Sequence, residues 1–273
     1  MTPKMLILDL DGTALVENAR VREDDCVAAR ALASAGVPVT IATGRLFRGT
    51  RQAALDLGVR GSVAVMNGTE LVDTQSAEVR YGSYLGREDR VQVRDILASH
   101  GLDAVLFGGE YIRYRNRPGL ADYLLTWTPD LEQHAELTDE NWYSPRVTAI
   151  AGCGDPPRVG RAAADIGQQV PAARAAVFTT WDGDGFVEVR AAGDDKGTAV
   201  HRLAAERGFT AAEVVVVGDW LNDLPMFRAA GLSFAMNGAV ERALAEVDAE
   251  LDAVRGQGGA VVEVARRVWG VEI

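Results

Sequence analysis

Apolar runs of strand length alternate with segments of helical spacing at the beginning of the chain. The runs occupy residues 5–8, 37–42 and 62–66, and each is short and apolar enough to be a buried strand. Between them, residues 24–35 carry apolar side chains at helical spacing, and a second helical segment ends at Leu57. Strand, helix, strand, helix, strand is the order of βαβ units, so the sequence predicts a parallel sheet with right-handed crossovers.

The same alternation returns near the end of the chain. Helices are expected at residues 196–207, 224–230, 239–246 and 258–269. Strands are expected at residues 213–217 and 232–236, and EVVVV at 213–217 is the most apolar strand candidate of the chain. The two ends of the chain therefore share one α/β pattern.

The middle of the chain follows a different pattern. Helices are expected at residues 87–100 and 159–170, and a strand at 147–151. Two strand pairs flank glycine-containing turns, residues 104–107 with 111–115 and residues 175–181 with 186–190, which is typical of hairpins. Hairpins with intervening helices indicate an antiparallel α+β layer. We therefore expect residues 83–189 to form a second domain, inserted into a first domain made of residues 1–82 and 190–273.

Small polar and acidic residues follow the predicted strands of the first domain. They are Asp9 and Asp11, Thr43 with Gly44 and Arg45, Asn67, and then Asp219, Asn222 and Asp223. A lysine, Lys196, opens the helix after the insert. The carboxyl ends of parallel strands meet at one edge of a sheet, and this edge is where open α/β sheets bind ligands.

Each of these signals also has a plainer explanation. The pair Asp9 and Asp11 could close a strand in a turn, and Thr43 could cap a helix. Lys196 could be a solvated charge, and Asp219 could be an acid favoured by a helix dipole. Their order along the chain and their joint placement at strand ends favour a common site.

Together these residue types suit the transfer of a phosphoryl group. Two carboxylates beside a glycine, which lets the backbone approach closely, suit a hard cation such as Mg²⁺. A carboxylate can attack phosphorus and form an aspartyl-phosphate that water later cleaves. This route requires a metal and a lysine to neutralise the repulsion between the anions. It also requires a neighbouring acid that protonates the departing oxygen.

Four short motifs resemble those of the haloacid dehalogenase superfamily. They are DLDGT at residues 9–13, TGR at 43–45, DKG at 195–197 and GDWLND at 218–223. The insert is similar in length and pattern to the C2-type α/β cap of the Cof-type, sugar-phosphatase-like branch, and MNG at 66–68 and AMNGA at 235–239 also resemble that branch. The resemblance implies a Rossmann-like, three-layer core with a parallel sheet and an inserted α+β cap that selects the substrate.

The resemblance also implies roles for the acidic residues. Asp9 would be the nucleophile and a Mg²⁺ ligand. Asp11 would be the general acid and base, and its backbone carbonyl would face the metal. Asp219 would ligate Mg²⁺, and Asp223 would be either a further ligand or an anchor behind one.

Further residues would hold the phosphate and the rest of the substrate. By the resemblance, the transferring phosphoryl group would be held by Thr43, Gly44, Lys196 and Asn222. Additional candidate substrate contacts are Arg45, Asn67, Arg113 and Arg115. The last two alternate along a predicted strand, with Arg117 beyond them, and so share one face. This row of arginines could hold an anionic leaving group or could be a solvated strand face.

The predicted function is a Mg²⁺-dependent phosphomonoester hydrolase that acts on small phosphorylated metabolites, sugar phosphates first, through an aspartyl-phosphate. The acidic pair favours a phosphatase over a dehalogenase, because a leaving alkoxide needs the proton of Asp11 and a halide does not. Two alternatives remain: a phosphomutase or phosphotransferase of the same superfamily, and a non-catalytic phospho-acceptor module like the response-regulator receivers.

Composition limits the partners and the setting. The 273 residues are 48% hydrophobic and carry a net charge of −11, which argues against binding to nucleic acid or to an anionic membrane. Cys26 and Cys153 lie far apart and form no disulfide framework or metal motif. With no secretory signal pattern and no long apolar segment in the sequence, a reduced cytoplasmic setting is expected. The sequence leaves the oligomeric state open.

Overall fold

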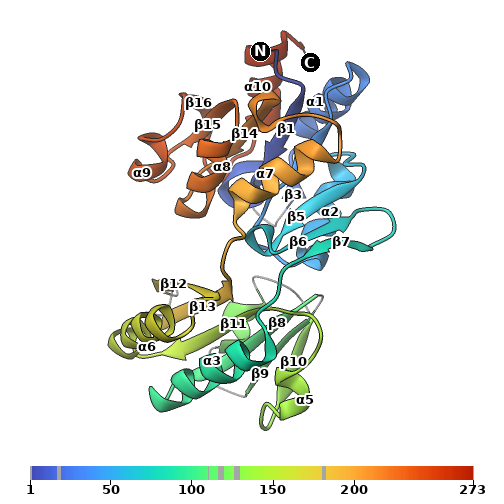
Figure 1. The fold of residues 1–273 in the computed structure, drawn as a ribbon. Helices are drawn as coiled ribbons and strands as arrows, with labels where there is room; N and C mark the ends of the chain where they lie inside the picture. Colours follow the sequence, from blue (N-terminus) through green and yellow to red (C-terminus); the bar gives the residue numbers. More distant parts are fainter. Residues whose placement is uncertain are drawn as a thin grey trace. The chain divides into compact units, whose positions relative to one another are not determined.

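The computed structural model describes residues 2–16, 20–109, 111–115, 120–125, 130–179 and 183–272. Figure 1 labels the helices and strands of the chain, which divides into two compact units. The core unit comprises Met1–Arg45, Thr50–Gly82 and Asp194–Ile273, and the inserted unit comprises Leu46–Gly49 and Ser83–Gly193. None of the helices in the described part of the chain is long and apolar enough to cross a membrane.

A five-stranded parallel sheet forms the centre of the core unit. Its strands, in spatial order, are β16 (Ala249–Val254), β15 (Leu232–Asn237), β14 (Val214–Gly218), β1 (Met5–Leu8) and β4 (Val39–Ile41). The central strand β1 is apolar and buried along its whole length, as expected for a strand covered on both faces. The parallel sheet predicted from the sequence is confirmed.

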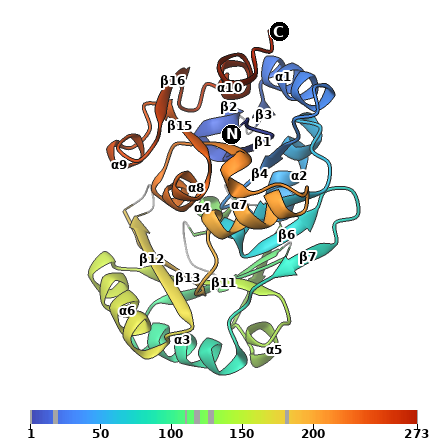
Figure 2. The same cartoon turned by 45° about the horizontal axis from the view of Figure 1, so that its top comes forward.

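Helices cover both faces of this sheet. Figure 2 shows α1 (Glu23–Ser34) and α10 (Ala260–Trp269) on one side, and α7 (Lys196–Ala205) and α8 (Leu224–Ala229) on the other. The side chains of Met5 and Ile7 pack into the same apolar cluster as those of α7 and α8. Since side chains alternate along a strand, Leu6 and Leu8 point to the opposite face. The remaining core helices are α2 (Phe47–Asp56) and α9 (Glu241–Leu244).

The strand that follows α2 departs from the predicted series. Instead of continuing the parallel sheet, β5 (Ser62–Val65) forms an antiparallel three-stranded sheet with β6 (Glu70–Asp73) and β7 (Val79–Gly82). A parallel bridge between Ala42 and Ala64 joins it to the end of β4. The physical reason is the tight turn Met66–Gly68, whose residues all have positive φ and reverse the chain without an intervening helix. A two-residue pair, β2 (Leu15–Val16) with β3 (Arg20–Val21), was also not predicted.

The inserted unit is built on a six-stranded sheet. The strand order is β10 (Leu131–His134), β9 (Tyr111–Arg115), β8 (Asp103–Gly108), β11 (Val147–Gly154), β13 (Gly185–Ala191) and β12 (Ala173–Thr179). The two predicted hairpins, β8 with β9 and β12 with β13, are confirmed as antiparallel pairs, whereas β9 and β10 run parallel. The helices are α3 (Arg87–Ser99), α4 (Leu120–Leu124), α5 (Asp139–Trp142) and α6 (Pro156–Gln169), and α3 and α6 share one apolar cluster with the sheet.

Candidate active site

Three buried carboxylates lie at the carboxyl ends of two neighbouring strands. Asp9 follows β1, while Asp219 and Asp223 follow β14. Because Leu8 lies opposite Val217 in the parallel register, both strands end at the same edge of the sheet. One carboxylate oxygen of each of the three residues lies within 4.8 Å of the others. Asp9, Asp219 and Asp223 therefore lie close together in the core unit, as the sequence predicted.

The donor set of this cluster fits Mg²⁺. It consists of carboxylate oxygens only, which hard cations prefer, and three carboxylates buried close together are costly because the one buried lysine compensates only part of their charge. A divalent cation would offset most of that cost. The carboxylate of Asp11 is not a member of the cluster, so any contribution of Asp11 to a metal through its backbone carbonyl stays a prediction.

Lys196 is the buried cation of the cluster. Its Nζ donates to Asp9 Oδ1 at 2.5 Å and to Asp223 Oδ1 at 2.6 Å, and the whole side chain is inaccessible to solvent. The residue occupies the first turn of α7, where the Asp195 carboxylate accepts the backbone N–H groups of Gly197 and Thr198. This capping box fixes where the helix begins and thereby the position of the ammonium group.

The electrostatics of the cluster follow from its burial. Burial raises the pKa of the Asp9 carboxyl well above its usual range; Lys196 opposes this rise, and the charges of Asp223 and Asp219 reinforce it. Burial also raises the pKa of Asp219. For Lys196, burial favours the neutral amine, but Asp223 and Asp9 outweigh it and raise the pKa of the ammonium. The lysine is therefore charged, and a cation bound among the carboxylates would offset the repulsion from Asp223 and Asp219 that adds to the effect of burial on the pKa of Asp9.

Close backbone approach makes the cluster compact. A Cβ atom on Gly12, whose φ is +81°, would lie 2.5 Å from Asp219 Oδ2. A Cβ atom on Gly218 would lie 2.5 Å from the carboxyl carbon of Asp223. Asp223 Oδ2, the oxygen that does not contact Lys196, accepts the backbone N–H groups of Asp219 and Trp220 at 2.8 and 3.0 Å. Asp223 therefore holds the loop after β14 with one oxygen and Lys196 with the other.

The loop after β4 brings three of the four predicted phosphate-holding residues next to Asn67, a predicted substrate contact. Thr43 is fully buried, and its Oγ1 accepts the backbone N–H of Arg45 at 3.2 Å. The backbone of Asn67 donates to the Thr43 carbonyl at 2.8 Å, while the amide side chain of Asn222 donates to Asn67 Oδ1 at 2.9 Å. A Cβ atom on Gly44 would lie 3.4 Å from Asn67 Oδ1 and 3.7 Å from Asn222 Nδ2. The four predicted residues Thr43, Gly44, Asn67 and Asn222 are thus neighbours.

Asp11 and Arg45 form a pair at the rim of the site. The Arg45 guanidinium donates to both carboxylate oxygens of Asp11, with Nε 2.8 Å from Oδ2 and Nη2 2.5 Å from Oδ1. Burial lowers the pKa of Arg45, but the hydrogen bond and charge of Asp11 outweigh it and raise that pKa. The side chain of Asp11 is 59% exposed and that of Arg45 is 17% exposed. Arg45 therefore holds the carboxylate of the predicted general acid, and its predicted contact with substrate stays a prediction.

The arginines predicted in the insert lie in the inserted unit. Arg113 is opposite Leu106, a member of the apolar cluster that α3 and α6 share with the sheet. Its guanidinium donates to Glu132 at 2.6 Å and stacks on Tyr111, with 3.8 Å to the ring centroid. Arg115 is exposed, and Arg117 lies outside the described residues. A role of Arg113 and Arg115 in substrate binding stays a prediction.

Two contacts of Asp219 were missed by sequence reasoning. Thr13 donates its hydroxyl to Asp219 Oδ1 at 3.0 Å. Arg255, in the loop after β16, donates from Nε to Asp219 Oδ2 and lies over the ring of Trp220. Thr13 stands inside a motif that already suggested a site, but Arg255 follows Asp219 by 36 residues and carries no local signal.

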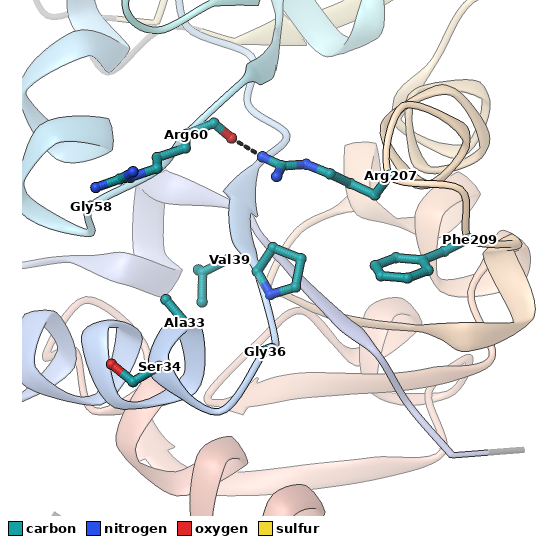
Figure 3. A pocket seen from close by; sticks show the side chains of 9 residues that line it. Ala33, Ser34, Gly36, Val39, Gly58, Arg60, Arg207 and Phe209 are labelled. Carbon is teal, nitrogen blue, oxygen red and sulfur yellow. Dashed lines mark hydrogen bonds between the residues drawn. The ribbon is translucent and has the colours of Figure 1, made fainter.

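A surface cavity of about 580 Å³ lies at the other edge of the core sheet. Its lining comes from the segments that precede β4, β5 and β14, which are the amino ends of these strands. Figure 3 shows Arg207 reaching across it to the carbonyl oxygen of Arg60. None of the clustered carboxylates lines this cavity, so the candidate active site is the carboxylate cluster and not this hollow.

Comparison with known proteins identifies the family. The family model of haloacid dehalogenase-like hydrolases matches residues 6–260. The chain belongs to this family. Within it the chain is of the Cof type, as the motifs suggested, and the protein is a hydrolase.

Relatives and solved structures are similar over nearly the whole chain. The HMP-PP phosphatase of Klebsiella pneumoniae (strain 342) is 25% identical over 264 residues, which cover 89% of this chain and 88% of the relative. The crystal structure of a haloacid dehalogenase-like hydrolase from Bacteroides thetaiotaomicron has a TM-score of 0.82 at 23% identity, over 98% of this chain and 100% of that one. The HAD subclass IIB sugar phosphatase BT4131 has a TM-score of 0.77 at 20% identity, over 98% and 99%. These structures confirm the predicted fold of this haloacid dehalogenase-like hydrolase.

Proposed function

We propose that the protein is a Mg²⁺-dependent phosphatase of small phosphorylated metabolites, sugar phosphates first, that works in the cytoplasm through an aspartyl-phosphate. The observation that carries the proposal is the Asp9 carboxylate, which is held by a buried, charged Lys196 inside a cluster of three carboxylates. A buried carboxylate beside a fixed ammonium group and further metal-binding carboxylates is suited to attack phosphorus.

Asp9, Asp219 and Asp223 are the residues that would hold Mg²⁺. When bound, the cation neutralises charge on the phosphoryl oxygens and so allows an anionic nucleophile to approach. Lys196 contributes a second positive charge at the same place. Thr43 and Asn222, beside Gly44, hold the remaining phosphoryl oxygens by hydrogen bonds.

The reaction then has two displacement steps on phosphorus. In the first, an Asp9 oxygen forms a bond to phosphorus while the bond to the leaving oxygen breaks, and protonated Asp11 gives its proton to that oxygen. In the second, Asp11 takes a proton from water, the water oxygen bonds to phosphorus, and the bond to Asp9 breaks. The Arg45 contact would hold the Asp11 carboxylate at the rim until substrate arrives. Asp11 would then leave this partner, take a proton from solvent and face the leaving oxygen.

The relatives support the class of substrate, and the inserted unit supplies the selectivity. The names of the two phosphatases, one acting on HMP-PP and the other on sugar phosphates, point to small phosphorylated metabolites. A phosphoryl site alone cannot distinguish leaving groups. The insert at residues 83–189, with Arg113 and Arg115 as candidate contacts, is therefore the domain that would select among them.

The test is phosphate release from a panel of sugar phosphates and a generic aryl phosphate, with Mg²⁺ and with EDTA. We expect release that needs Mg²⁺ and is lost, by about 10³-fold or more, in Asp9→Asn. The matched control is Asp24→Asn, which removes an exposed carboxylate at the start of α1. A protein that binds Mg²⁺, releases no inorganic phosphate and consumes the phosphorylated substrate only when a sugar acceptor is added, with the phosphoryl group appearing on that acceptor, would contradict hydrolysis and favour the phosphomutase or phosphotransferase.

A further inference from the structure

Arg255 is a cation on the carboxylate cluster that the proposed chemistry does not use. Its Nε donates to Asp219 Oδ2, and its guanidinium lies 4.9 Å from the centroid of the Trp220 ring. The loop that carries it is fixed by backbone hydrogen bonds, from Arg255 N to the Asn237 carbonyl at 2.8 Å and from Gly256 N to the Gly12 carbonyl at 2.9 Å. The backbone is thus anchored to the site, while the side chain is 41% exposed.

Arg255 and a divalent cation would both act on the negative charge of this cluster. The three buried carboxylates exceed the single charge of Lys196, so the cluster is anionic without a metal. Arg255 reduces that excess from the solvent side. A Mg²⁺ ion bound to Asp219 would neutralise the same excess and would repel the guanidinium.

Asp219 does not need Arg255 to stay in place. Its Oδ1 accepts the hydroxyl of Thr13 at 3.0 Å, its carbonyl accepts the backbone N–H of Val240 at 3.1 Å, and the residue is fully buried. Trp220, at 46% exposed, offers an aromatic face on which the guanidinium can rest after it leaves the carboxylate. The main effect of Arg255 on the cluster is therefore its charge.

We propose that Arg255 is an exchangeable counter-ion of Asp219, which stabilises the metal-free site and competes with the divalent cation for this carboxylate. The proposal rests on the Mg²⁺ site of the proposed function and adds a residue that sets its affinity. Arg255 acts on the site through the charge of Asp219. It makes no contact with the reacting atoms in this scheme.

The experiment measures Mg²⁺ binding by isothermal titration calorimetry in the full chain, with wild type, Arg255→Gln and Arg255→Lys. Removal of the charge in Arg255→Gln should tighten the Kd for Mg²⁺ about fivefold, the size expected for one partly exposed charge pair. Arg255→Lys keeps the charge and should stay within about twofold of wild type. Arg228→Gln is the matched control, since it removes one charge that pairs with Glu246 at the surface.

Thermal unfolding in EDTA supplies a second readout. The melting temperature of Arg255→Gln should fall below that of wild type in EDTA, and Mg²⁺ should raise it by more than it raises that of wild type. If Arg255 were only structural, Arg255→Gln would lower the melting temperature without lowering the Kd for Mg²⁺. Unchanged or weaker Mg²⁺ binding in Arg255→Gln would overturn the proposal, as would equal tightening in Arg228→Gln. If wild type itself binds no Mg²⁺, the metal site of the proposed function fails as well.

Discussion

Replacing Lys196 by Met tests how the buried cluster is held together without a metal. The substitution keeps most of the side-chain volume and removes the ammonium group that contacts Asp9 and Asp223 at 2.5 and 2.6 Å. Two buried carboxylates then face each other without a cation. Removing one partner of a buried ion pair costs about 3–5 kcal/mol. For a unit of this size, a loss of 1 kcal/mol lowers the melting temperature by about 2–4 °C, so a fall of roughly 10 °C is expected.

The assay is thermal unfolding of Lys196→Met in EDTA at two pH values. Because burial raises the pKa of Asp9 above its unfolded value, the folded state binds the proton more tightly, and removal of the lysine strengthens this effect. The stability of the variant should therefore increase as the pH falls towards the usual carboxyl range. The deficit relative to wild type should be larger at pH 8 than at pH 5.

The chain provides a matched control because it has only two lysines. Lys4 is 51% exposed and pairs with Glu213 at 2.6 Å, so Lys4→Met should cost no more than about 1 kcal/mol. Saturating Mg²⁺ should recover part of the stability of Lys196→Met but not its phosphate release. A variant as stable in EDTA as Lys4→Met, at both pH values, would refute the view that Lys196 neutralises buried carboxylates.

Three further substitutions test the site and its support. Asp9→Asn removes a carboxyl whose pKa burial raises, so the melting temperature in EDTA should rise although phosphate release is lost; a lower value would contradict this. Gly12→Ala should weaken Mg²⁺ binding and lower the free energy of unfolding by about 2 kcal/mol or more, because the added Cβ would meet the Asp219 carboxylate. Gly36 has a similar φ of +83° but nothing within 4 Å of an added Cβ, so Gly36→Ala should lower the free energy of unfolding by only about 1 kcal/mol through backbone strain. Equal costs would exclude the clash. Asp25→Ala should cost about 2 kcal/mol in urea unfolding, since Asp25 accepts three backbone N–H groups at the start of α10, and exposed Asp24→Ala should cost much less.

The sequence predicted those parts of the site in which a strand and the functional residue that follows it lie in one short segment. Apolar runs predicted the strands β1 and β14. Because parallel strands end at the same edge of a sheet, they also predicted that Asp9 and Asp219 lie at one edge. The start of α7 was marked by Lys196 and the residues around it, and the capping box confirms that boundary. Local patterns of this kind depend on contacts within a few residues.

The sequence did not predict contacts between residues far apart in the chain, nor the strand at the edge of the core sheet. The strand Ala249–Val254 alternates apolar and polar residues, which is too polar for a buried run, and it was not predicted. The pairing of Arg45 with Asp11 joins two predicted site residues in a way that no pattern reveals. Arg255 reaches Asp219 from a loop without periodicity, so only the folded chain brings it to the site.

The carboxylate cluster is better explained by chemistry than by stability. Replacing buried ionic groups by apolar side chains of similar volume is often neutral or stabilising, so a fold under no other demand would not keep three carboxylates at this edge. The adjacent turn is strained as well, because Met66 and Asn67 adopt φ of +48° and +56°, a conformation that costs energy for residues other than glycine. That turn presents Asn67 to Asn222 beside the buried Thr43 loop. The strained turn and the buried charges therefore lie next to each other, where the proposed phosphoryl group would bind. Binding that group would explain why the chain keeps both of these destabilising features.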